Sequence, residues 1–152
     1  MTPPIVAGLI DAGRSIGIRR IEEGLEYTPV VKTSLRGDEL AKAISNMYDG
    51  SYGVDKGIPE KVPEYMYWWI GLGYDAQRIL EACITHLILV RRQAELAIQF
   101  QALQPKLHKA GNSKSQAGDL AILLAAYGGA YNLVDLLREG FYSEMYRLNH
   151  ER

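Results

Sequence analysis

Two long segments of this chain, residues 75–104 and 119–149, carry apolar side chains at the spacing of an amphipathic helix. In the first segment these side chains recur from Leu80 to Ala97, and Pro105 is expected to end the helix. A helix of about thirty residues is roughly 45 Å long, which exceeds the width of a domain of this size. The sequence therefore predicts two long helices that carry the core and lean on a neighbouring chain.

The first half of the chain divides into shorter segments. Pro3 and Pro4 stand where a helix begins, and apolar residues follow at helical spacing to about residue 24. Residues 27–35 are rich in β-branched side chains, which predicts an extended segment. Asp38 is then expected to cap a short helix that ends near Asp49.

A glycine- and proline-containing segment, residues 49–63, has no apolar period and is typical of a binding loop. The densest aromatic cluster follows at residues 65–74, where Pro63 is expected to start another helix. Adjacent Trp68 and Trp69 would point about 100° apart on that helix. One of the two indoles is therefore expected to lie at an interface.

These patterns predict an all-α fold with two long antiparallel helices, shorter flanking helices and an N-terminal arm. One domain is expected over residues 1–152. Its parts are an N-terminal helix and arm over 1–37, a short helix, loop and aromatic segment over 38–74, and a long helical hairpin over 75–152.

Charge and cysteine content exclude few functions. The 152 residues carry a formal net charge of −1, so the chain as a whole is not drawn to nucleic acid or to an anionic membrane. Cys83 is the single cysteine, which favours a reducing compartment, and Asp11 interrupts the first apolar stretch, so a secretory leader is not expected. The longest nearly uncharged run is shorter than the ~20 residues that span a bilayer. A cytoplasmic protein without a membrane span is predicted.

Two short motifs near the N-terminus resemble catalytic or phosphate-binding signatures. Residues 13–17 match the G-x-S-x-G pattern of a nucleophile elbow around Ser15, but too few residues precede Ser15 to supply the required strand and oxyanion donor. Residues 8–15 are one substitution from a phosphate-binding loop, with Arg14 in the place of its lysine. Without the strand alternation of a nucleotide-binding fold, both matches are interpreted as chance.

Cys83 and His86 are three residues apart on one helical face, a spacing that can place both on a metal ion. A structural zinc site needs four ligands, and no second pair with this spacing accompanies them. The sequence thus predicts no metal site, no cofactor and no catalytic residues, and it predicts that the protein is not an enzyme.

Binding is predicted through two sets of residues. Glycines on the first helix allow close approach of another backbone, and aromatic side chains favour a protein interface. The predicted interface residues are Tyr65, Tyr67, Trp68, Trp69, Tyr74, Gly8 and Gly13. A mildly basic patch is the candidate for nucleic-acid contact, and it comprises Arg91, Arg92, Lys106, Lys109 and Lys114.

The opening segment, residues 3–18 (PPIVAGLIDAGRSIGI), resembles the start of small tailed-phage proteins of the lysis and virion-assembly modules. The resemblance covers about sixteen residues and implies a virion location. We therefore expect a structural or adaptor subunit of a multi-copy assembly, with its own copies and other assembly proteins as partners. The alternatives are a helical nucleic-acid-associated or regulatory protein, and a small helical enzyme whose site the sequence does not reveal.

Overall fold

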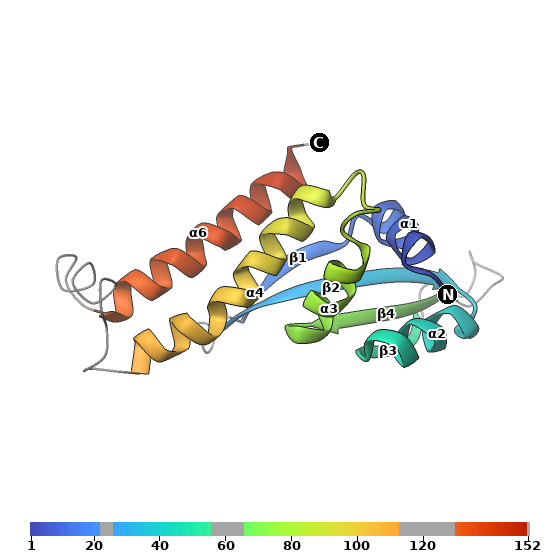
Figure 1. Cartoon of the computed structure of the whole chain (residues 1–152), viewed down its shortest axis with the longest axis horizontal. Helices are drawn as coiled ribbons and strands as arrows, with labels where there is room; N and C mark the ends of the chain where they lie inside the picture. The colour runs from blue at the N-terminus through green and yellow to red at the C-terminus, as the bar shows by residue number, and fades with distance from the viewer. Residues whose placement is uncertain (22–25, 56–65, 113–129, 152) are drawn as a thin grey trace.

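The computed structural model describes residues 1–21, 26–55, 66–112 and 130–151, and it contains a four-stranded sheet with helices packed against it (Figure 1). The elements are, in chain order, α1 (Pro3–Gly13), β1 (Ile16–Ile21), β2 (Glu26–Arg36), α2 (Asp38–Tyr48), β3 (Ser51–Asp55), β4 (Met66–Leu72), α3 (Tyr74–Cys83), α4 (Arg91–Asn112) and α6 (Ala130–His150). The strands are antiparallel in the order β1-β2-β4-β3. The prediction of an all-α fold is therefore wrong, because the described chain combines helices with a sheet.

β2 is the longest strand, and its residues alternate between the two faces of the sheet. Val31, Thr33 and Leu35 are buried, whereas the residues between them are exposed. This alternation is what a strand with one covered face requires. The predicted extended segment at residues 27–35 is confirmed.

The helix predicted from residue 5 to about residue 24 ends early. α1 stops at Gly13, Arg14 adopts a left-handed conformation with φ 47°, and β1 begins at Ile16. In β1, Ile16 pairs with Val31 of β2 and is buried with it. Pairing with β2 satisfies the backbone and buries an apolar side chain, which a glycine-rich helix does not achieve alone.

The aromatic segment predicted as a helix is strand β4. Successive residues of a strand point to opposite faces, so Trp68 and Trp69 are separated by the pleat rather than by a helical turn. Trp69 is fully buried on the helix-covered face, and its indole N–H donates a hydrogen bond of 2.8 Å to the carbonyl oxygen of Asp49. The two indoles do point in different directions, but for a reason that the helical interpretation did not contain.

Part of the predicted loop at residues 49–63 is also a strand, β3, which pairs with β4 at the edge of the sheet. Gly50 lies between α2 and β3 with φ +79°, and a Cβ atom there would lie 2.7 Å from the Trp69 ring. Glycine is therefore required at this turn, both for its backbone conformation and for the space that Trp69 occupies. Residues 56–65 lie outside the described part of the chain.

The helix predicted over residues 75–104 consists of two helices. α3 ends at Cys83, residues 84–90 form turns, and α4 then continues past Pro105, which lies inside it. The break is held by Asp11 of α1, whose carboxylate accepts hydrogen bonds from the backbone N–H groups of Ile88, Leu89 and Val90 at 2.8, 3.1 and 3.1 Å. This carboxylate satisfies amides that would otherwise be unpaired at the approach to α4.

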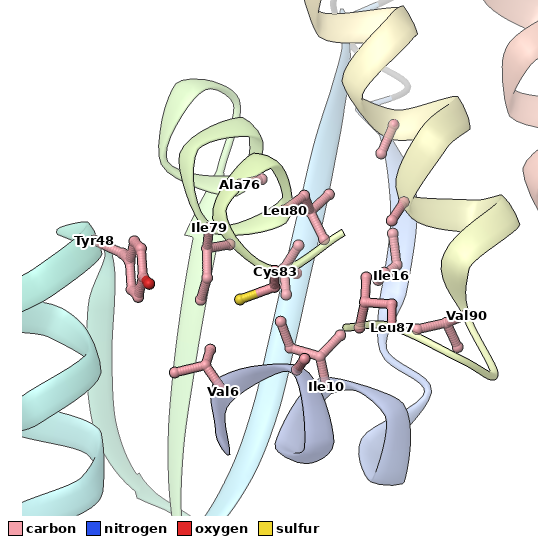
Figure 2. Close-up of a cluster of buried hydrophobic side chains, with 14 of the residues drawn as sticks. Val6, Ile10, Ile16, Tyr48, Ala76, Ile79, Leu80, Cys83, Leu87 and Val90 are labelled. Atoms are coloured by element: carbon pink, nitrogen blue, oxygen red, sulfur yellow. The ribbon is translucent and has the colours of Figure 1, made fainter. Parts of the chain in front are cut away.

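The predicted core positions of this segment are nonetheless correct. Leu80, Cys83, Leu87, Val90, Ala94 and Ala97 are all buried. Figure 2 shows side chains from α1, α3, β1 and the segment before α4 converging with Tyr48 of α2. The core thus lies between one face of the sheet and the helices.

α4 and α6 run antiparallel and in contact (Figure 1). Phe100 of α4 packs against Phe141 of α6 with ring centroids 5.3 Å apart. The Asn149 side chain of α6 donates to the Ile16 carbonyl oxygen of β1 at 3.0 Å, which fixes α6 against the sheet. The predicted helical run begins earlier, but residues 119–129 lie outside the described residues. Among the helices described, we find none long and apolar enough to cross a membrane.

Removing the Asp11 carboxylate should destabilise the fold. Asp11→Asn loses a charged acceptor of three backbone hydrogen bonds at a buried site, and we expect a loss of about 2 kcal/mol in the free energy of unfolding. Urea denaturation followed by circular dichroism measures this loss. Asp75→Asn, in the first turn of α3, is the control and should cost about 0.5 kcal/mol. Equal losses in the two variants would contradict the assigned role of Asp11.

Candidate nucleic-acid interface

The face of the sheet that points away from the core carries side chains from all four strands. The strand register places Arg19 beside Thr28, Lys32 beside Ile70, and Arg36 beside Met66 on this open face. The other residues of the open face whose side chains are described are Gly17, Val30, Ser34, Ser51, Gly53, Asp55, Trp68 and Leu72. Cations and polar groups lie mainly on β1 and β2, and apolar side chains lie mainly on β4.

The three cations of the open face, Arg19, Lys32 and Arg36, are all exposed. Thr28, Lys32 and Arg36 follow one another along β2 at intervals of four residues, and Arg19 of β1 pairs with Thr28. The three cations are therefore about 13 Å apart in succession at ~3.3 Å per residue. We call these three residues the cationic row.

No hydrogen bond or ion pair is found for the side chains of the cationic row within the ranges that the structure describes. Asp55 is the one acidic side chain described on the same face, and it lies two strands away from Arg36. Among the open-face residues whose side chains are described, three positive charges stand against one negative charge, although the net charge of the chain is −1.

Several cations outside the open face form ion pairs with acidic side chains. Arg20, which neighbours Arg19 but points to the helix-covered face, forms an ion pair with Glu139 of α6 at 3.5 Å and lies 5.9 Å from the centre of the Tyr142 ring. Ion pairs also join Lys42 to Asp38, Arg78 to Asp49, Arg91 to Glu95, and Arg147 to both Glu144 and Glu151. Each of these cations is paired within the chain, whereas the three cations of the cationic row have no ion pair among the described residues and are available for an external anion.

β4 supplies the apolar part of the open face. Met66, Trp68, Ile70 and Leu72 are its four successive outward residues, and we call them the apolar strip. Leu72 is 40% exposed and the other three are half-buried. Gly53 of β3 pairs with Trp68, and a Cβ atom at Gly53 would lie 2.7 Å from the Trp68 ring. The indole therefore lies across the edge strand.

The structure separates Arg91 and Arg92 from Lys106 of the predicted basic patch. Arg91 and Arg92 lie at the start of α4, and Lys106 lies about 22 Å further along the helix at ~1.5 Å per residue. Arg91 is paired with Glu95, and the charge of Arg92 helps to lower the pKa of Glu144, after the larger effect of its hydrogen bond with Arg147. Lys109 lies in the part of α4 whose side chains are not described, and Lys114 lies outside the described residues.

The predicted interface residues are also dispersed. Trp69 is wholly in the core, and Tyr67 is half-buried on the same face. Trp68 is on the open face, Tyr74 is 63% exposed at the start of α3, and Tyr65 lies outside the described residues. Gly8 and Gly13 are exposed on α1.

The short motifs near the N-terminus take no catalytic form. Ser15 lies between helix α1 and strand β1, which is the reverse of the strand-to-helix turn of a nucleophile elbow, and its hydroxyl donates to the Gly13 carbonyl oxygen at 2.9 Å. Residues 8–13, where a phosphate-binding loop would be open, are helical. Burial raises the pKa of the Cys83 thiol to about 11, so Cys83 is protonated at neutral pH, whereas His86 is exposed.

Solved structures of DNA-bound enzymes share this architecture. The homing endonuclease I-CvuI in complex with the I-CreI target, in the presence of Mg and with the DNA not cleaved, matches with a TM-score of 0.57 and 18% identity over 97% of this chain and 94% of that chain. I-CvuI with its target Sro1.3 in the presence of Ca matches with a TM-score of 0.53 and 17% identity over the same shares. The archaeal intron-encoded homing endonuclease I-Vdi141I complexed with DNA matches with a TM-score of 0.52 and 15% identity over 88% of this chain and 96% of that chain. This chain has the homing-endonuclease fold.

No protein-family model and no curated protein matches the chain. The homing-endonuclease fold contradicts the predicted structural or adaptor subunit of a virion, since the matched structures are DNA complexes of enzymes. It also contradicts the prediction that the protein is not an enzyme. Of the predicted functions, the nucleic-acid-associated alternative agrees best with the fold.

Mg or Ca was present in the I-CvuI structures, and carboxylates are among the protein ligands that bind these cations. Within the described residues, no group of three or more His, Cys, Asp or Glu side chains could hold a metal ion. Asp11, at the end of α1, already accepts three backbone hydrogen bonds. Within one copy of the chain, the described residues therefore supply no complete site for such a cation.

Sequence reasoning did not find the cationic row. Its members come from two strands, and only the register of β1 against β2 aligns Arg19 with Lys32 and Arg36. The alternation in β2 of Lys32, Ser34 and Arg36 with buried residues was the available signal, because it marks one polar face of a half-buried strand.

Proposed function

We propose that this protein is a DNA-binding endonuclease that holds duplex DNA against the open face of its sheet. The observation that carries the proposal is the cationic row, Arg19, Lys32 and Arg36, exposed and without partners among the described residues. The DNA complexes of proteins with the same fold support it.

The spacing of the cationic row suits a duplex. From Arg19 to Arg36 the row extends about 26 Å along β2, which corresponds to about eight base pairs at ~3.4 Å per pair. Cations placed at intervals along such a length neutralise phosphates and release condensed counterions, which drives binding without regard to sequence. Ser34 lies between Lys32 and Arg36, and Thr28 lies beside Arg19; both hydroxyls can donate hydrogen bonds to phosphate or base oxygens.

A second copy of the chain is part of the proposal. The outer face of α1 carries Ile5, which is 54% exposed, and exposed Gly8, at which an added Cβ would meet nothing within 4 Å. Beside α1, held by Asp11, lie Ile88 and Leu89 at 82% and 58% exposure. Exposed apolar side chains on two neighbouring segments are typical of a surface that associates with another chain. A symmetric pair through this surface would bring two sheets to one duplex.

Removing the cationic row should weaken binding and reduce its salt dependence. We expect the triple variant Arg19→Ala, Lys32→Ala, Arg36→Ala to reduce the magnitude of the slope of log K against log salt by about 2.7 for each copy of the chain on the duplex, or about 0.9 for each phosphate that is no longer neutralised. Fluorescence anisotropy with a labelled random-sequence duplex over a salt series measures both quantities.

The matched control removes three cations from the helices instead, in the variant Lys42→Ala, Arg78→Ala, Arg91→Ala. The control loses three positive charges, as the triple variant does, so the change in net charge is the same. Because these three cations are paired with acidic side chains, the control should retain the salt slope of the unmodified protein. An equal fall of the slope in the control would show that net charge matters, and the sheet face would not be the binding surface.

Cleavage can be tested on DNA that the protein has selected. We expect that a duplex enriched by binding from a random pool and placed in a supercoiled plasmid is nicked or linearised in a Mg²⁺-containing buffer. Gel electrophoresis separates the supercoiled, nicked and linear forms. A plasmid that is bound but stays supercoiled would contradict the endonuclease and favour a regulatory DNA-binding protein.

Gly8→Glu should disrupt self-association, because it places a charge on the apolar surface of α1. Gly140→Glu in α6 is the matched control, since Gly140 is also a helical glycine whose added Cβ would meet nothing within 4 Å. Sedimentation equilibrium should show a mass of about twice 17.0 kDa for the unmodified chain and the control, and a monomer for Gly8→Glu. A monomeric unmodified chain, or a dimer that tolerates Gly8→Glu, would contradict the pairing through α1.

A further inference from the structure

The apolar strip is an unusual neighbour for a cationic row. All four outward residues of β4 are apolar, whereas β2, one strand away at ~4.8 Å, presents Lys32, Ser34 and Arg36 on the same face. No helix of the described chain covers this face, and Leu72 remains 40% exposed. Because apolar side chains gain from leaving water, the strip is suited to a ligand that is both anionic and apolar at its surface.

Trp68 is the largest member of the strip. Its ring lies across Gly53, where the absence of a Cβ atom leaves the space the ring occupies. The indole N–H has no hydrogen-bond partner that we find in the described residues, so one edge of the ring can donate while its body offers apolar area. The cost of leaving so large a side chain half-exposed is offset if a ligand covers it.

We propose that the apolar strip recognises thymine methyl groups in the major groove, with Trp68 as the principal specificity-determining residue. The inference rests on the proposed DNA binding of the open face and names what that face selects. Arg19, Lys32 and Arg36 contact phosphates at the border of the groove, and β4 lies beside them over the base edges.

The chemistry of the base edges selects thymine. In the major groove each base pair presents hydrogen-bond donors and acceptors, and the C5-methyl of thymine is the apolar group among them. The four residues of the apolar strip offer few hydrogen-bonding groups to the edge of a G·C pair. The donors and acceptors of that pair would lose their hydrogen bonds to water and gain none from the protein. The apolar strip therefore favours A·T pairs, with the thymine methyl against the indole.

A protein partner is the other occupant that an apolar strip can have. The cationic row argues for DNA, because a partner protein would have to bring acidic groups to three exposed cations about 13 Å apart at ~3.3 Å per residue, while a duplex presents phosphates along its whole length. The experiment is designed so that the two occupants give different results.

Replacement of thymine by deoxyuracil tests the inference, because it removes the methyl and leaves the base pairing intact. A duplex is first selected for binding by the unmodified protein from a random-sequence pool. Each thymine of that duplex is then replaced in turn by deoxyuracil, and the dissociation constants are measured by anisotropy. We expect at least one position at which the replacement weakens binding by about fourfold, which corresponds to burial of one methyl at ~0.8 kcal/mol.

Two variants assign that position to the strip. Trp68→Thr keeps a strand-favouring residue but removes the ring, and it should bring the thymine-to-uracil ratio at that position to about one. Gly53→Ala keeps Trp68 but displaces its ring, and it should change the ratio at the same position. Tyr146→Ala, which removes an exposed aromatic side chain from α6, is the control and should leave the ratio unchanged. Circular dichroism establishes that each variant is folded.

The outcomes separate the inference from the function on which it rests. Equal binding of thymine and uracil duplexes by the unmodified protein, or an unchanged ratio in both Trp68→Thr and Gly53→Ala, would overturn thymine recognition and leave DNA binding standing. Loss of self-association in Trp68→Thr with an unchanged ratio would assign the strip to a protein contact and overturn the inference. Absence of binding to any duplex at low salt would overturn both.

Discussion

The arrangement of this molecule depends on the burial of one face of its sheet. Val31, Leu35 and Trp69 point to the same side, and the helices pack over them. Because side chains alternate along each strand, the same pleat that buries Trp69 turns Trp68 outward, and the alternation that buries Val31 and Leu35 exposes Lys32 and Arg36. The open face is therefore a direct consequence of the core, and its charge is set by residues that the core does not use.

The helices are placed by a few polar contacts with that sheet and with each other. Asp11 joins the end of α1 to the approach to α4 through three backbone amides, and Asn149 joins α6 to β1. Arg20 completes the attachment of α6 through Glu139. These contacts hold the helices on one side and leave the cationic row of the other side unpaired among the described residues.

The sequence alone was enough to predict the elements whose pattern is local. Residues 27–35 were expected to be extended, and the buried positions from Leu80 to Ala97 were identified correctly. β4 was missed because Met66 and Ile70 on its open face are as apolar as Trp69 on its buried face, which hides the period of two. The break between α3 and α4 was missed because the carboxylate that stabilises it is 77 residues away in sequence.

The candidate site was less predictable than the fold. A basic patch was expected on α4, where positive residues are close in sequence, but Arg91 is paired there and Lys106 is more than four helical turns away. The cationic row is assembled by strand register, which depends on long-range pairing that no local pattern specifies. Arg19 and Arg20 are adjacent in sequence but point to opposite faces of the sheet. Arg20 therefore pairs with Glu139 of α6, whereas Arg19 belongs to the cationic row.

The most direct test of the open face as the DNA surface is protection of a thiol by DNA. Cys83 is the only cysteine and is buried, so Ser34→Cys on the open face and Ser143→Cys on the exposed side of α6 each introduce one accessible thiol. The rate at which a water-soluble maleimide modifies each variant is measured with and without a random-sequence duplex at low salt. The account predicts that DNA slows modification of Ser34→Cys at least tenfold and leaves Ser143→Cys unchanged. Protection of Ser143→Cys with unaltered modification of Ser34→Cys would contradict it.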